Sequence, residues 1–237
     1  MGKLHLILKF IDINMWLPKF ELFISLFLAT TLLVFESSCQ PILRATIGMH
    51  SSKYLSQSEI EEYARIYHID SDNLYILDEV KYLAFVDEYT KVSGKNYFEE
   101  NFLTNPLLVM GFDQTGSNQF FMRSCDAGGF PNLKWNRYGY FDHHPLLMNP
   151  LYLPDTLYGL DSFQTYVQFY KPLNPSTGFV DSSCKEILVV HWNNIMGRQT
   201  KRLLKTVNTY IEVNCDNICV LYVNTDNLYA RTKKQFH

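Results

Sequence analysis

The sequence predicts an α/β fold, a sheet covered by helices on both faces. The clearest indication lies near the carboxyl terminus, where apolar strands over 186–192 and 217–223 flank an amphipathic helix over 200–213. A strand, a helix and a strand in such close succession form a βαβ unit with parallel strands and a right-handed crossover. The first of these strands is apolar throughout, which indicates a sheet centre that is buried on both faces.

The helix over 200–213 has one apolar and one basic face. The apolar face carries Leu203, Leu204, Val207 and Ile211, and the other carries Lys201, Arg202 and Lys205. Further upstream, apolar runs over 107–112 and 118–123 are joined by a turn-rich segment, which predicts a β-hairpin. We also expect a short strand over 74–77, a helix over 79–89 and a short helix that Asp161 caps and that ends near Tyr170.

The first helix of the body is expected to begin near Ser56 or Ser58. Either serine is a suitable cap, and Ser58 is followed three residues later by Glu61, the spacing of a capping box. The apolar face of this helix includes Tyr63 and Tyr67.

Composition places the chain among globular proteins and argues against nucleic-acid binding. Apolar residues make up 47% of the 237 residues and charged residues 19%. The net charge is −3, and residues 1–38 contain equal numbers of basic and acidic residues, so the remainder also carries −3. No basic surplus is available to neutralise phosphates.

The amino-terminal segment is typical of a secretory signal. Residues 22–35 are apolar or small and uncharged, too short for a spanning helix of about 20 residues but suited to a signal core. Ser37 and Ser38 precede Cys39, and this arrangement resembles the lipobox of bacterial lipoproteins, in the looser form of Bacteroidota, where the cysteine is acylated. An uncleaved anchor helix is the alternative, and translation starts at Met1 or Met15.

We therefore expect a signal peptide over 1–38, a lipid-anchored tether over 39–52 and a single α/β domain over 53–237. The tether begins without an acidic run, which favours attachment to the envelope facing the periplasm. The membrane is then a partner through the lipid anchor.

The residues that follow the strand over 186–192 resemble a thioredoxin-like domain of the TlpA/AhpC type. Such domains run from a strand through Trp-x-x-Trp-Cys-Gly-Pro-Cys into a helix. In 189–199, Trp192 matches the first tryptophan, Met196 the nucleophilic cysteine, Gly197 the glycine and Gln199 the resolving cysteine. The resemblance implies a thioredoxin-like, or incomplete thioredoxin-like, three-layer sandwich with a core of about 105–227 and an amino-terminal α+β extension.

The resemblance also implies a site without redox activity. Thiol–disulfide exchange requires a thiolate, and neither a thioether nor an amide replaces it. The family's cis-proline strand follows the second βαβ strand, but no proline follows Asp226 here. The fold is therefore truncated, or it is completed by the hairpin that lies earlier in the chain. The candidate binding surface at this corner comprises Trp192, Asn193, Asn194, Met196, Gly197 and Arg198.

A second candidate surface is the loop over 128–136. Gly128 and Gly129 permit positive φ angles, and Phe130 and Trp135 offer rigid aromatic contact area. The alternative is a tight connection that places both rings in the core.

Four cysteines follow Cys39, and three interpretations are open for them. Cys125, Cys184, Cys215 and Cys219 are buried thiols, which we favour, or form structural disulfides, or include a relocated redox pair such as Cys215 with Cys219 or Cys125 with Cys184. Spacing alone does not decide between these interpretations.

No catalytic residue, metal site or cofactor is indicated by the remaining motifs. His143 and His144 are adjacent and lack a third ligand at a recognisable spacing, and His191 is interpreted as a sheet residue. The function expected is that of a binding or interaction module with a protein partner in the envelope, and the alternative is a thiol–disulfide oxidoreductase.

The lipoprotein interpretation predicts that Cys39→Ser blocks both cleavage and acylation. Mass spectrometry of the membrane fraction should find an acylated residue 39 at the amino terminus of the mature wild-type chain and an intact precursor in the variant. Recovery of unacylated Cys39, or of an intact 20–38 segment in the wild type, would reject it.

Overall fold

The computed structural model describes residues 48–93, 103–129, 132–146, 162–175, 184–214 and 218–235. They all belong to one compact unit, Ile47–His237. The predicted signal segment, Cys39, Phe130, Asp161 and Cys215 lie outside the described residues. Within the described part, no helix has the length and apolar character needed to cross a bilayer.

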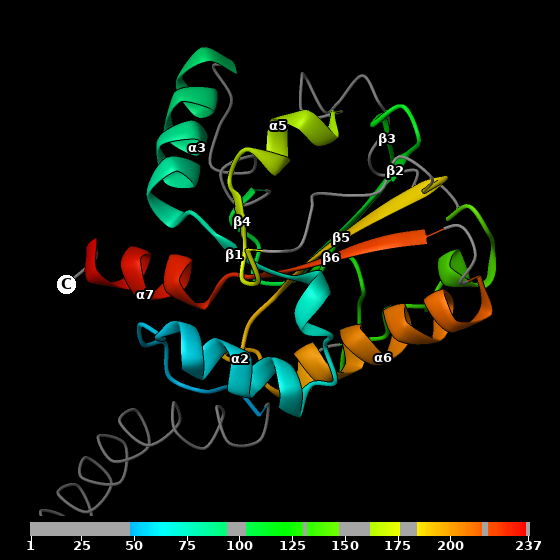
Figure 1. The fold of residues 1–237 in the computed structure, drawn as a ribbon, viewed down its shortest axis with the longest axis horizontal. Helices are drawn as coiled ribbons and strands as arrows, with labels where there is room; N and C mark the ends of the chain where they lie inside the picture. The colour runs from blue at the N-terminus through cyan, green and yellow to red at the C-terminus, as the bar shows by residue number, and fades with distance from the viewer. Residues whose placement is uncertain are drawn as a thin grey trace, which may run out of the picture. The chain divides into compact units, whose positions relative to one another are not determined.

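Helices and strands are interspersed along the described chain, with strands in direct succession at β2–β3 and β4–β5 (Figure 1). In chain order they are α2 (Gln57–Ile66), β1 (Leu74–Leu77), α3 (Glu79–Ser93), β2 (Leu108–Asp113), β3 (Asn118–Arg123), α5 (Phe163–Val167), β4 (Tyr170–Pro172), β5 (Glu186–Trp192), α6 (Arg198–Val213), β6 (Ile218–Asn224) and α7 (Asp226–Gln235). Short 3-10 turns cover Ser71–Asn73 and Tyr140–Asp142.

One mixed sheet of six strands organises the unit, in the order β3-β2-β5-β6-β1-β4. β5, β6 and β1 are parallel, as the predicted βαβ unit requires. The hairpin β2–β3 lies on the other side of β5 and is antiparallel to it, with Val109 opposite Val190. The α/β class, the hairpin and the parallel β5–α6–β6 unit are therefore confirmed.

Helices cover both faces of the sheet, with α2 and α6 on one side and α3 and α5 on the other (Figure 1). Alternate side chains of β5 enter the two cores. Leu188, Val190 and Trp192 pack with α2 and α6, whereas Ile187 and Val189 pack with α3, α5 and α7. Every residue of β5 is buried, which accounts for the apolar run from Ile187 to Val190, and the buried Glu186 and His191 have hydrogen-bond partners inside the protein.

The cap of α2 differs from the predicted Ser58–Glu61 pair. The Ser56 hydroxyl accepts a hydrogen bond from the Glu59 backbone N–H, and the Glu59 carboxylate accepts one from the Ser56 N–H. This capping box satisfies two helix-end donors. Ser58 already lies inside the first turn of the helix.

Two elements were not predicted, and one was shorter than expected. α5 ends at Val167 because the chain enters β4 at Tyr170, which pairs with Leu77 of β1. β4 has only three residues and ends in proline. The Ser162 side chain caps α5. The segment after Asp226 forms α7, whose Leu228 is 1% exposed and completes the second core.

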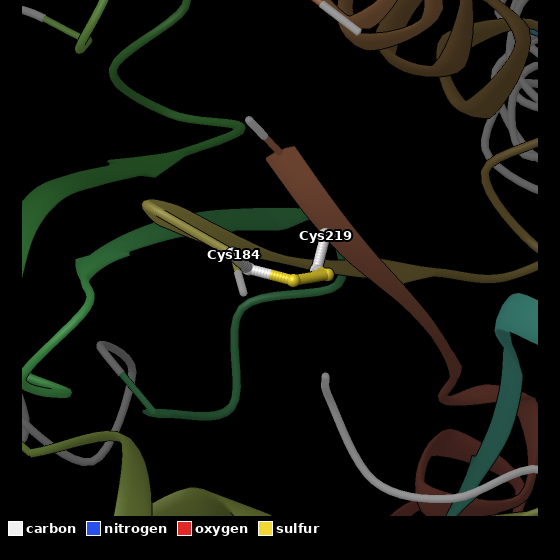
Figure 2. Close-up of a disulfide and its surroundings, with 2 residues drawn as sticks. All are labelled: Cys184 and Cys219. Atoms are coloured by element: carbon white, nitrogen blue, oxygen red, sulfur yellow. A yellow bond between two sulfur atoms is a disulfide. The ribbon is translucent and has the colours of Figure 1, made fainter. Parts of the chain in front are cut away.

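A disulfide joins Cys184, just before β5, to Cys219 in β6 (Figure 2). The Cα atoms are 5.7 Å apart, a usual separation for a disulfide. The favoured interpretation of buried free thiols is therefore wrong for this pair, and it is also wrong for Cys125, which is free but exposed. Spacing did not reveal the pairing because the two cysteines meet only when β5 and β6 align.

Removing the disulfide should lower the free energy of unfolding. The bond closes a loop with a sequence separation of 35, for which the chain-entropy model gives roughly 3–4 kcal/mol. Urea unfolding of a Cys184→Ala/Cys219→Ala variant should show this loss, whereas Cys125→Ser should stay within about 0.5 kcal/mol of the wild type. A double variant as stable as the wild type would contradict the structural role.

Candidate functional site

The predicted corner connects the end of β5 at Trp192 to the start of α6 at Arg198. It lies at the carboxyl end of the central parallel strands, which is the edge where open α/β sheets usually bind ligands. This position makes the corner the first place to look for a site.

Most of the predicted corner residues are covered by the protein itself. Trp192 and Asn193 are fully buried and Met196 is 8% exposed, and Gly197 is buried as well. The Trp192 ring packs edge-to-face against Tyr67, with centroids 5.6 Å apart. These four residues are therefore turned into the protein: Tyr67 packs on Trp192, the Gly48 backbone lies over Gly197, and the Asn193 side chain is hydrogen-bonded inside the protein.

Side-chain hydrogen bonds hold the corner in one conformation. The Asn193 side chain accepts from the Met196 N–H at 2.9 Å and donates to the Pro106 carbonyl at 2.7 Å. The buried Asp226 carboxylate accepts from the Asn194 N–H at 2.9 Å and from the Ile195 N–H at 3.3 Å. Burial raises the pKa of Asp226, and these hydrogen bonds oppose that rise.

The segment Gly48–His50 covers the start of α6. The His50 N–H donates to the Ile195 carbonyl at 2.8 Å, and the Arg198 N–H donates to the Gly48 carbonyl at 3.4 Å. Gly197 has a φ of +39°, and a Cβ atom there would lie 2.0 Å from the Gly48 oxygen. A glycine is therefore required, and the first turn of α6 faces the protein's own backbone.

Two adjoining hollows lie between α2 and α6, and we call them together the α2–α6 groove. Their volumes are about 520 and 590 Å³. They share Ile66, Tyr67 and Lys201, and the other lining residues are Gly48, His50, Tyr63, His68, Asn194, Gly197, Arg198, Leu204, Lys205, Asn208, Thr209 and Glu212.

The groove has an aromatic and aliphatic wall and a basic wall. Ile66 is 49% exposed on α2, while Arg198, Lys201 and Lys205 are exposed on α6. In the described part of the chain, Lys201 and Lys205 form no ion pair. Asn194, Gly197 and Arg198 of the predicted surface all line this groove, but Gly197 is buried, so Asn194 and Arg198 form its accessible part.

Sequence reasoning missed the α2 side of the groove. Tyr63 and Tyr67 were assigned to an apolar face, which is correct, but that face also borders a hollow beside α6. The sequence does predict the basic wall on α6, because Lys201 and Lys205 are four residues apart and therefore lie on the same side of the helix.

The second predicted surface, the loop over 128–136, contributes less than expected. Gly128 and Gly129 have φ angles of +63° and +74°, as predicted. Trp135 is 1% exposed and belongs to the core, so the alternative interpretation holds for this ring. The Leu133 N–H donates to the buried Gln199 side chain at 3.0 Å, which ties the loop to α6.

No thiol lies at the corner among the described residues. Cys184 and Cys219 lie at the amino-terminal ends of β5 and β6, away from the corner. Their bond to each other excludes the pairs Cys215–Cys219 and Cys125–Cys184 that the sequence left open. Burial and the neighbouring Asp126 raise the pKa of the Cys125 thiol, so this cysteine is not an activated nucleophile.

His191 is a core residue rather than a catalyst. Its Nε2 lies 3.0 Å from the Tyr170 hydroxyl, and burial lowers the pKa of His191 to about 3, so the ring is neutral. The described residues contain no group of three or more side chains arranged to hold a metal ion.

No known protein family matches this chain, and no curated protein and no solved structure shows significant similarity to it. The function proposed below is therefore inferred from the geometry of the groove and the corner.

Gly197→Ala should destabilise the protein more than Gly116→Ala. Both glycines have positive φ, for which a non-glycine residue costs about 1–3 kcal/mol. Only at position 197 does the new Cβ overlap a backbone oxygen, whereas at 116 its nearest neighbour is 3.5 Å away. Urea unfolding of the two variants measures the difference, and equal losses would show that Gly48 does not cover the corner.

Proposed function

We propose that this protein is an envelope-anchored binding module with a redox-inactive, thioredoxin-like scaffold, and that the α2–α6 groove is its contact surface.

The scaffold proposal is supported by the strands beside β5. A thioredoxin-like core needs an antiparallel strand on the side of β5 opposite the βαβ partner. The earlier hairpin supplies it, because β2 pairs antiparallel with β5 while β6 pairs in parallel. This arrangement agrees with the expectation that the hairpin completes the fold. Pro106 lies two residues before β2 and has a trans peptide bond, and its carbonyl accepts a hydrogen bond from the corner residue Asn193.

The redox-inactive part of the proposal rests on one observation, the burial of the corner at the start of α6. Met196 is buried where a nucleophilic sulfur would have to be reachable, and the Gly48 carbonyl lies over the first N–H of α6. A helix amino terminus lowers a thiol pKa through its free N–H groups. Here there is neither a thiol nor an open first turn.

The character of the groove favours an anionic partner. Arg198, Lys201 and Lys205 outnumber the single acidic lining residue, Glu212, and the partly exposed Tyr63 supplies aromatic surface. Arginine and aromatic side chains are enriched where proteins bind one another. An acidic segment of an envelope protein matches this combination of charge and aromatic area.

The envelope address is supported by the disulfide as well as by the signal-like segment. Structural disulfides persist in oxidising compartments and are rare in the cytosol. Cys184 is 8% exposed and linked to a central strand, which fits a structural bond.

The redox assignment predicts no turnover in an insulin-reduction assay with dithiothreitol as reductant. Wild type, Cys125→Ser and Cys184→Ala/Cys219→Ala should all give the uncatalysed rate. Turnover that disappears only in the double variant would contradict the assignment and favour the thiol–disulfide oxidoreductase.

The binding assignment predicts charge-dependent cross-linking from the groove in intact cells. A photoreactive amino acid at Ile66 should capture a partner, and one at Val80, which is exposed on α3, should not. Adding Lys201→Glu should reduce the capture about fivefold, as expected for the loss of about 1 kcal/mol of binding free energy. Lys134→Glu, which lies outside the groove, should not reduce it. Capture that is unchanged by Lys201→Glu would contradict an anionic partner.

A further inference from the structure

A buried carboxylate lies at the start of β5, at the opposite end from the corner. Glu186 is 5% exposed, and a charge at such a depth requires partners. The Tyr210 hydroxyl of α6 donates to its Oε2 at 2.6 Å, and His144 Nδ1 lies 3.1 Å from the same oxygen. The Leu146 N–H reaches Oε1 at 3.5 Å.

These contacts define which nitrogen of His144 carries the proton. Burial and Glu186 raise the pKa of Tyr210, so the phenol stays protonated and its hydrogen points to the carboxylate. His144 Nδ1 therefore faces two acceptors, Glu186 Oε2 and the phenol oxygen at 2.9 Å. Nδ1 must be the N–H, which leaves Nε2 with a lone pair in the neutral ring.

The His144 ring also borders a hollow, which we call the His144 hollow. Its volume is about 470 Å³, within the usual range for small-molecule sites. The side chain of His144 is 28% exposed. The hollow is otherwise lined by polar side chains, Asn136, Asp142, Lys205, Thr206, Thr209 and Asn214, and by the aromatic and aliphatic side chains of Phe141, Tyr210 and Val213.

The lining argues against an ionic ligand and for a neutral one. Lys205 and Asp142 contribute one charge of each sign, so neither an anion nor a cation is favoured overall. Amides and hydroxyls both donate and accept hydrogen bonds, and an imidazole lone pair accepts them. The side chains of Asn136, Thr206 and Asn214 already form hydrogen bonds within the protein. We therefore expect a ligand to use Lys205, Thr209 and His144 Nε2. A ligand that pairs with these groups must both donate and accept hydrogen bonds, as a sugar does.

We propose that the His144 hollow binds a neutral hydroxyl-rich small molecule, a mono- or disaccharide, and that one sugar hydroxyl donates a hydrogen bond to His144 Nε2. Glu186 is a positioning residue, because it holds the ring through Nδ1 and does not line the hollow, whereas Tyr210 both contacts Nδ1 and lines the hollow. The hollow adjoins the α2–α6 groove, with which it shares Lys205 and Thr209, whereas Ile66 and Lys201 line only the groove.

The test is saturation-transfer NMR on the full chain in a detergent without a sugar headgroup. The probes are glucose, galactose and N-acetylglucosamine, with hexanediol as an apolar control. We expect transfer to at least one sugar and none to hexanediol. His144→Phe should weaken binding about tenfold, as expected for loss of a hydrogen bond worth about 1.4 kcal/mol, whereas His143→Phe in the same segment should not.

Two further variants keep the proposal falsifiable if His144→Phe does not fold. Thr209→Val removes an exposed hydroxyl from the rim and should also weaken sugar binding. Glu186→Gln should change the ring ¹⁵N shifts of His144 from the single Nδ1–H tautomer to a mixture, which a purely structural contact would not require. Absence of transfer to all three sugars, or equal affinity in wild type, His144→Phe and Thr209→Val, would overturn the proposal.

Discussion

The packing of Gly197 against Gly48 is the constraint on which the rest of the site depends. It brings the segment before α2 over the start of α6, and it is possible only because residue 197 has no Cβ. Once this segment is in place, Met196 is buried and the first turn of α6 has a backbone partner. The corner then supports the floor of the α2–α6 groove.

Buried polar side chains hold this support in place from the other side. Asp226 accepts two backbone N–H groups of the corner, and Asn193 connects the corner to the region before β2. Such networks specify one conformation when every member has a partner. The α2–α6 groove therefore has a rigid basic wall, and the His144 hollow lies further along α6 with a rigid base of its own.

What the sequence predicted well is what neighbouring residues determine. The bounds of β1, β3 and β5 follow from short apolar runs and their turns, and β5 reads as a buried strand because both of its faces are covered. β4 escaped notice because three residues ending in proline carry no strand pattern, and their pairing with β1 lies almost 100 residues away in sequence.

The sites were harder to predict because they depend on distant segments. Tyr67 reaches Asn194 across 127 positions, and His144 reaches Tyr210 across 66. Trp192 and Met196 were expected to face a partner because a local alignment cannot show what packs over them. Similarly, the Cys184–Cys219 bond depends on the register of β5 and β6 rather than on spacing.

The central claim is that the only disulfide among the described residues maintains the fold and does not exchange electrons. Its reduction potential, measured by thiol trapping and mass spectrometry in dithiothreitol redox buffers, tests this most directly. We expect a reduction potential below about −300 mV, as for structural disulfides of secreted proteins. A value between about −120 and −270 mV, where the thiol–disulfide oxidoreductases lie, would contradict it.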